Sequence, residues 1–220
     1  MSAYKQYDIT NASFEEFVNF LFDQEVIPDD AKLQEPWYYH AEVIYDSVRV
    51  VTQYIQLFTQ LAFLLTQFSR AQLEQGFWAI QSPNLECGVR EIVWNESLGF
   101  DFRRNCVRSM FYLFECLFSK EALDTSVEMW WDSLAYDWHC GNRSRANGGE
   151  DELMQDVMFE TLSKILELDS ATCQRAALHG LGHLHHPDTE PLIRRYIECN
   201  KTIDPALREY ALSAARFEVL

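Results

Sequence analysis

The stretch that decides the fold is ATCQRAALHGLGHLHHPDTEPLIRRYI, residues 171–197, which directly follows Ser170. Leucines recur in it at helical spacing, and small residues stand between them. Two of these small residues are Gly180 and Gly182, and a glycine costs a helix interior roughly 1 kcal/mol relative to alanine. The pattern therefore predicts a helix that packs closely against a neighbouring helix, then a turn at Pro187 and a second helix.

A weaker copy of this pattern follows about 34 residues later. Asp204 takes the place of Ser170, and Ala214 takes the place of Gly180. Repeated helix pairs with small residues at their crossings are typical of stacked helical repeats. Residues 169–217 resemble the HEAT-like repeats, including the short variety found in phycobilisome lyases. The resemblance implies an architecture that mostly binds other proteins, and it does not name the partner.

The rest of the chain also favours helices. Only 8 glycines and 6 prolines occur in 220 residues, which argues against many short strands joined by turns. We expect an all-α fold of about nine or ten helices, stacked as antiparallel pairs in a HEAT-like α-solenoid or superhelix. Residues 1–220 are expected to form a single domain, with an aromatic-rich helical half (1–120) and a HEAT-like repeat half (121–220). The expected helices cover 14–23, 40–67 (one helix or a pair), 69–80, 102–118, 125–138, 151–168, 170–184, 188–199 and 205–216.

Several of these helix starts carry a serine or threonine followed three residues later by a glutamate or glutamine. This is the pattern of a capping box, in which each side chain accepts a hydrogen bond from the backbone of the other residue. The three pairs are Ser13 with Glu16, Ser69 with Gln72, and Thr125 with Glu128. Their positions set the expected starts of the first, third and fifth helices.

The chain is strongly acidic, and the acidity is regional. Its formal net charge is −16 and its pI is about 4.7. Residues 1–46 carry 10 acidic and 2 basic side chains, and residues 121–169 carry 12 and 3, whereas the two intervening regions are nearly neutral. Excess negative charge disfavours binding to nucleic acid or to an anionic membrane, so we expect neither as a partner.

Several other classes of protein are disfavoured by the absence of their patterns. The most apolar stretch, 54–68, contains glutamines and is shorter than the roughly 20 residues of a membrane span. The N-terminus does not have the pattern of a signal peptide, so we expect a cytoplasmic protein with free thiols. P-loop, GxGxxG, GxSxG and Glu-x-x-His motifs are absent. We therefore predict no cofactor and no catalytic residue, which leaves open an active site assembled only by folding.

Histidines gather in one short segment, 179–186, which holds four of the six in the chain. His179 and His183 are four residues apart, so both imidazoles lie on one face of a helix and form a workable pair of metal ligands. We take His179, His183 and His186 as the candidate ligands, with Asp188 close enough in sequence to approach them. The simpler interpretation places these histidines on the outer face and the turn of a repeat.

Two acidic ridges are predicted on the helices expected at 125–138 and 151–168. They are formed, at a spacing of four residues, by Asp124, Glu128 and Asp132 and by Glu152, Asp156 and Glu160. Like charges at this spacing cost a helix a few tenths of a kcal/mol per pair, so the ridges are either a solvated face or a docking surface. Trp130 is expected to be exposed beside the first ridge as an interface anchor. Arg143 and Arg145 lie in the loop between the helices and either pair with the ridges or close over a ligand.

These features lead to two functional hypotheses. The first is a non-catalytic protein-binding module whose acidic surface captures a basic protein partner. Its charge and size are similar to those of immunity proteins, which inhibit nucleic-acid-cleaving toxins. The substitutions Glu128→Lys and Asp132→Lys should then weaken capture of the partner. The alternative is a metal-binding protein or an enzyme that uses the cluster at 179–186. The identity of the partner and the oligomeric state are left open by the sequence.

Overall fold

The computed structural model describes residues 4–27, 34–121 and 123–219, and helices predominate in this part of the chain. The described residues form eleven α-helices and one pair of short strands, which confirms the mostly helical class. They include no helix with both the length and the apolar character needed to cross a bilayer. The chain divides into two compact units, residues 1–109 and 110–220.

The first unit begins with strand β1 (Lys5–Asp8) and helix α1 (Phe14–Phe22). The elements that follow are the 3₁₀-helix η1 (Trp37–Tyr39), β2 (Ala41–Ile44), α2 (Ser47–Thr59), α3 (Leu64–Gln67), α4 (Arg70–Gln81), α5 (Val89–Val93) and α6 (Phe100–Leu113), which runs into the second unit. Helices α1 and α4 pack together through aromatic side chains, with the rings of Phe22 and Phe77 5.1 Å apart.

Helices α1 and α4 begin where the capping boxes predict. The Ser13 hydroxyl accepts a hydrogen bond from the Glu16 amide, and the Glu16 carboxylate accepts one from the Ser13 amide at 2.7 Å. Ser69 and Gln72 make the same reciprocal pair at the start of α4. Each box satisfies two backbone donors that the first helical turn leaves unpaired, which explains why the sequence fixes these two boundaries.

The prediction of a helix over 40–67 is wrong for its first residues. Ala41–Ile44 is instead strand β2, which pairs in parallel with β1, so that Lys5 lies opposite Ala41. Alternate residues of β2 are buried, a period of two that spans too few residues to be recognised in the sequence. The helix then starts later, because the Asp46 carboxylate caps α2 by accepting the Arg49 amide at 2.8 Å.

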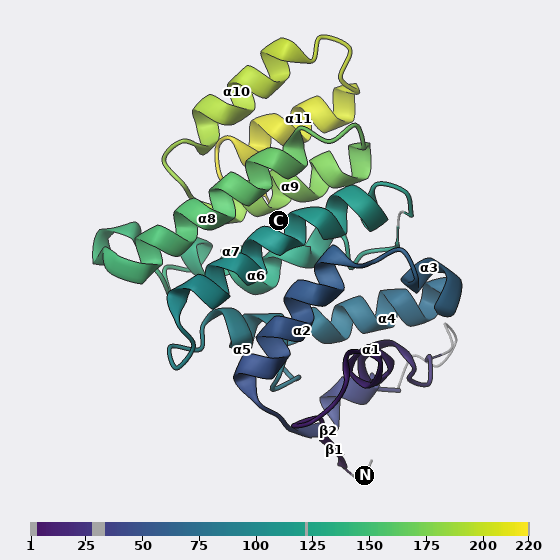
Figure 1. The fold of residues 1–220 in the computed structure, drawn as a ribbon. Coiled ribbons are helices and arrows are strands. Elements are labelled where there is room, and N and C mark those ends of the chain that lie inside the picture. Colours follow the sequence, from purple (N-terminus) through teal and green to yellow (C-terminus); the bar gives the residue numbers. More distant parts are fainter. Residues whose placement is uncertain (1–3, 28–33, 122, 220) are drawn as a thin grey trace. The chain divides into compact units, whose positions relative to one another are not determined.

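The second unit is built around helix α9. Its elements are the π-helical turn η2 (Phe114–Phe118), the 3₁₀-helix η3 (Glu128–Trp131), α7 (Asp132–His139), the 3₁₀-helix η4 (Arg145–Asn147), α8 (Gly149–Leu166), α9 (Ala171–Leu184), α10 (Thr189–Cys199) and α11 (Pro205–Ala214). Helix α9 contacts η3, α7, α8, α10 and α11. Figure 1 shows α8 to α11 running beside one another in the green-to-yellow part of the chain.

Glycine allows the closest of these contacts, as the sequence predicts. A Cβ atom added to Gly180 would lie 2.7 Å from the Cβ of Trp131 and 2.8 Å from a methyl of Leu162. Carbon atoms normally pack no closer than about 3.5 Å, so α9 can approach η3 and α8 only without a side chain at this position. The close packing that the glycine pattern predicted is confirmed at Gly180.

The helix expected over 125–138 begins later than predicted. Residues 128–131 form the 3₁₀-helix η3, and the α-helix α7 runs from Asp132 to His139. Asp124 therefore precedes both elements and does not continue a row with Glu128. The helix expected over 151–168 is present as α8, which starts two residues earlier.

Candidate metal centre

Polar side chains from η3–α7 and from α9 face each other across the contact between these elements. One row holds Glu128, Asp132 and Tyr136, and the other holds Arg175, His179 and His183, each with a spacing of four residues. Residues four apart share one helix face, so two packed helices bring the two rows together rung by rung. The first rung is an ion pair between Arg175 Nε and Glu128 Oε1 at 2.7 Å.

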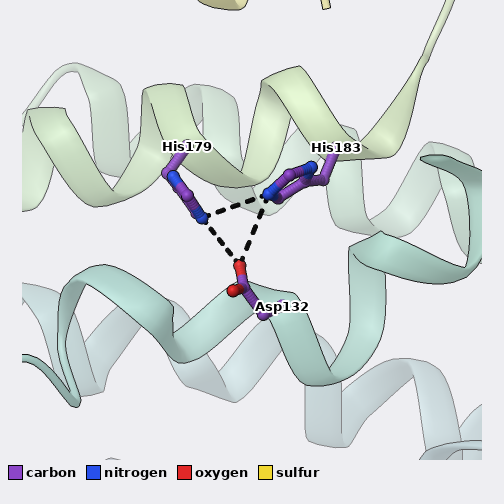
Figure 2. A group of neighbouring side chains, drawn as sticks. All are labelled: Asp132, His179 and His183. Atoms are coloured by element: carbon purple, nitrogen blue, oxygen red, sulfur yellow. Dashed lines mark hydrogen bonds and ion pairs between the residues drawn. The ribbon is translucent and has the colours of Figure 1, made fainter. Parts of the chain in front are cut away.

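The second rung joins Asp132 to two histidines, as Figure 2 shows. Asp132 Oδ1 lies 2.8 Å from His179 Nε2 and 3.8 Å from His183 Nε2. The two Nε2 atoms are 3.2 Å apart. One carboxylate oxygen and two imidazole nitrogens therefore point at a common space between α7 and α9, and we call Asp132, His179 and His183 the His–Asp triad.

Burial of the triad is uneven. The imidazoles of His179 and His183 are 1% and 3% exposed, whereas the Asp132 side chain is 38% exposed. Asp132 Oδ1 itself is shielded from water and makes no directed hydrogen bond, although His179 Nε2 is close to it. His183 Nδ1 is likewise buried without a hydrogen-bond partner. Buried polar atoms normally have partners, so these two atoms require a physical explanation.

The pKa of His183 is lowered from its ordinary value of 6.5 to about 4, and burial is the largest cause. The neighbouring imidazoles of His179, His139 and His185 contribute to this lowering, because they disfavour another positive charge, whereas the Asp132 carboxylate opposes it. His183 is therefore a neutral imidazole at neutral pH. The neutral form has a lone pair available to a metal ion.

Acid should destabilise the metal-free protein between about pH 6.5 and pH 4. His183 is protonated near pH 6.5 in the unfolded chain and only near pH 4 in the folded chain. The unfolded state therefore binds more protons in this interval, and the free energy of unfolding decreases as the pH is lowered. Urea unfolding in chelator at about pH 7 and pH 4.5 measures the loss, which should shrink in His183→Gln. The same loss in that variant would contradict the assignment to His183.

A second pair of histidines adjoins the triad. His139 Nδ1 lies 3.1 Å from His185 Nε2, and the His139 ring meets the His183 ring edge-on with centroids 5.0 Å apart. His185 has a left-handed backbone (φ 53°) and ends α9. Its imidazole stacks on Phe217, which also has a positive φ. These contacts hold the pair in place next to His183.

The structure places His186 outside the triad, contrary to its prediction as a ligand. His186 Nε2 lies 3.0 Å from Asp156 Oδ1, and its Nδ1 accepts the backbone N–H of Asp188. Its ring stacks on Phe159 with centroids 4.0 Å apart. Both nitrogens of His186 are therefore engaged elsewhere, because the left-handed residue His185 turns the chain away from the helix face.

Asp132 is the third member of the triad, and the sequence did not assign it to the metal site. Its position four residues before Tyr136 on one helix face was visible, but only folding reveals which helix lies opposite. Tyr210 of α11 was also not predicted, and its hydroxyl lies 2.5 Å from His179 Nδ1. Its only sequence signal is its place on the predicted helix 205–216.

The expectation that Trp130 is exposed is wrong. Trp130 is fully buried, and its indole N–H donates to the sulfur of Met110 at 3.4 Å. Trp130 is two residues from both Glu128 and Asp132, and side chains two residues apart on a helix do not share a face. The tryptophan therefore belongs to the core and offers no anchor for a partner.

Three of the predicted acidic residues, Glu128, Glu152 and Asp156, pair with arginine. Arg145 pairs with Glu152 at 3.0 Å and with Asp156 at 2.5 Å, and Arg143 pairs with Asp151 at 2.7 Å. Burial alone would raise the pKa of Asp156, but hydrogen bonds from Arg145 and His186 lower it. Of the two roles considered for the arginine loop, the structure shows pairing with α8.

The predicted ridges therefore do not form two uniform rows of carboxylates. Asp124 and Glu160 are exposed, and Glu128 is half-buried beside Arg175. Capture of a basic protein by these residues stays a prediction from net charge.

Comparisons with protein families, with curated proteins and with solved structures found no match for this chain.

Proposed function

We propose that this protein binds one divalent transition-metal ion through Asp132, His179 and His183. The observation that carries the proposal is the compact triangle formed by the three potential ligand atoms, with sides of 2.8, 3.2 and 3.8 Å. A triangle with these sides has a point about 1.9 Å from all three atoms, and Zn²⁺ binds nitrogen and oxygen at roughly 2.0–2.2 Å. An ion would need to sit only slightly out of the plane.

The state of the polar atoms supports the same proposal. Asp132 Oδ1 is a buried acceptor whose contact with His179 Nε2 at 2.8 Å is not a directed hydrogen bond, and a cation between the two atoms would be a partner for both. His183 is neutral near pH 7, as a ligand must be, and its Nε2 points into the triangle. The carboxylate supplies one negative charge, which partly neutralises the charge of a divalent ion.

The donor set indicates the type of ion and of centre. Two imidazoles and one carboxylate suit Zn²⁺ and also Fe²⁺, and both leave coordination positions open when only three protein ligands are present. The Asp132 side chain is partly exposed although its Oδ1 is shielded, so this side of the triad lies near the surface. Three ligands with an open position are typical of catalytic zinc centres, whereas structural zinc sites usually have four protein ligands.

Zinc titration of the purified, chelator-treated protein tests the proposal. We expect one Zn²⁺ per chain, and loss of this tight binding in Asp132→Asn, which keeps the shape of the side chain but removes its charge. The matched control is Asp124→Asn, because Asp124 is an exposed acid outside the triad. Competition with a chromophoric chelator gives the affinity, and elemental analysis gives the stoichiometry. Absence of stoichiometric metal, or equal weakening in both variants, would refute the proposal.

A further inference from the structure

Tyr210 connects helix α11 to the His–Asp triad. Its hydroxyl lies 2.5 Å from His179 Nδ1, the nitrogen that points away from Asp132. The two rings are nearly parallel, with an angle of 4° between their planes. The guanidinium of Arg175 lies 4.2 Å from the centre of the Tyr210 ring, and Arg175 is itself paired with Glu128. The phenol is thus held from two sides.

We infer that Tyr210 is a positioning residue of the metal centre, which holds the His179 imidazole so that Nε2 faces the ion. The inference rests on the proposed function and deepens it. Histidines that bind metals usually donate their other ring N–H to a fixed acceptor, which sets the tautomer and the orientation of the ring. Tyr210 Oη is in position to be this acceptor, because a phenol oxygen accepts hydrogen bonds as well as donating them.

The direction of this hydrogen bond decides whether His179 can bind a metal. If Tyr210 donates to Nδ1, the proton of a neutral imidazole sits on Nε2, which then faces Asp132 Oδ1 and cannot act as a ligand. If Nδ1–H donates to Tyr210, Nε2 carries the lone pair and faces the triangle. Metal binding therefore requires the second direction, and removal of the hydroxyl should weaken metal binding without removing a ligand.

The test compares two tyrosines that each place a hydroxyl against α9. Tyr210→Phe removes the hydroxyl at His179, whereas Tyr196→Phe removes one that donates to Gln174 Oε1 at 2.9 Å, outside the triad. We expect Tyr210→Phe to raise the dissociation constant for Zn²⁺ by about 10- to 100-fold. Tyr196→Phe should leave the dissociation constant unchanged. Unfolding in chelator shows whether each substitution affects the metal-free fold.

A second measurement does not depend on any variant. Nitrogen-15 NMR of the zinc-loaded wild-type protein should show the His179 proton on Nδ1. The inference is overturned if that proton is absent from Nδ1, if Tyr210→Phe binds Zn²⁺ as tightly as the wild type, or if both tyrosine variants weaken binding equally. Failure of the wild-type protein to bind zinc would instead refute the proposed function, and this inference with it.

Discussion

Saturating Zn²⁺ should raise the free energy of unfolding by about 4 kcal/mol when the free ion is about 1,000 times the dissociation constant. The reason is that Asp132 and the two histidines come from separate helices and meet only in the folded chain. For a chain of this size the expected rise in melting temperature is roughly 8–16 °C. Thermal unfolding with zinc and with chelator measures the difference. In His183→Ala the difference should disappear.

The matched control for this experiment is His40→Ala. His40 lies outside the histidine cluster and pairs with Glu35 at 2.7 Å. Zinc should stabilise this variant as much as it stabilises the wild type. Equal stabilisation of His183→Ala and the wild type would show that the ion binds elsewhere. An unchanged melting temperature in all three proteins would contradict the metal centre.

The local parts of the fold could be predicted because they depend on neighbouring residues. Both confirmed capping boxes join residues three positions apart, so the sequence contains the whole interaction. The β1–β2 pair could not be predicted, since each strand has four residues and its partner lies in another segment. The start of α7 at Asp132 was also missed. Thr125 and Glu128 match the capping-box pattern and predicted an earlier start, but residues 128–131 form a 3₁₀-helix.

The same distinction explains what the sequence could indicate about the site. His179 and His183 are four residues apart on one helix, and the spacing alone places their imidazoles together. Asp132 joins them through the packing of α7 against α9, which no local pattern specifies. His186 was included wrongly, because nothing in the spacing indicates that His185 adopts a left-handed backbone and ends the helix face.

Packing at Gly180 leads to the second large expected effect, because this residue allows α9 to approach η3, which directly precedes Asp132. Gly180→Val should lower the free energy of unfolding by about 3 kcal/mol, since its first side-chain carbon would already overlap Trp131 and Leu162. The Leu162 methyl can rotate away, but the Cβ of Trp131 is fixed to the backbone of η3 and its indole is fully buried. Denaturant unfolding in chelator measures the loss.

Gly182→Val is the matched control, because the change from glycine to valine alters the intrinsic helix propensity by the same amount at both positions. The three atoms nearest to a Cβ at Gly182 are side-chain atoms of Val219, no more than 3.3 Å away, and Val219 is a buried residue that follows the last helix, so its segment is not fixed by a helical backbone as Trp131 is. We therefore expect Gly182→Val to be the milder variant by about 2 kcal/mol. Trp131 directly precedes Asp132, so the displacement in Gly180→Val should also weaken zinc binding. Equal destabilisation by the two variants would show that the contact with Trp131 does not set the spacing of α9 and η3.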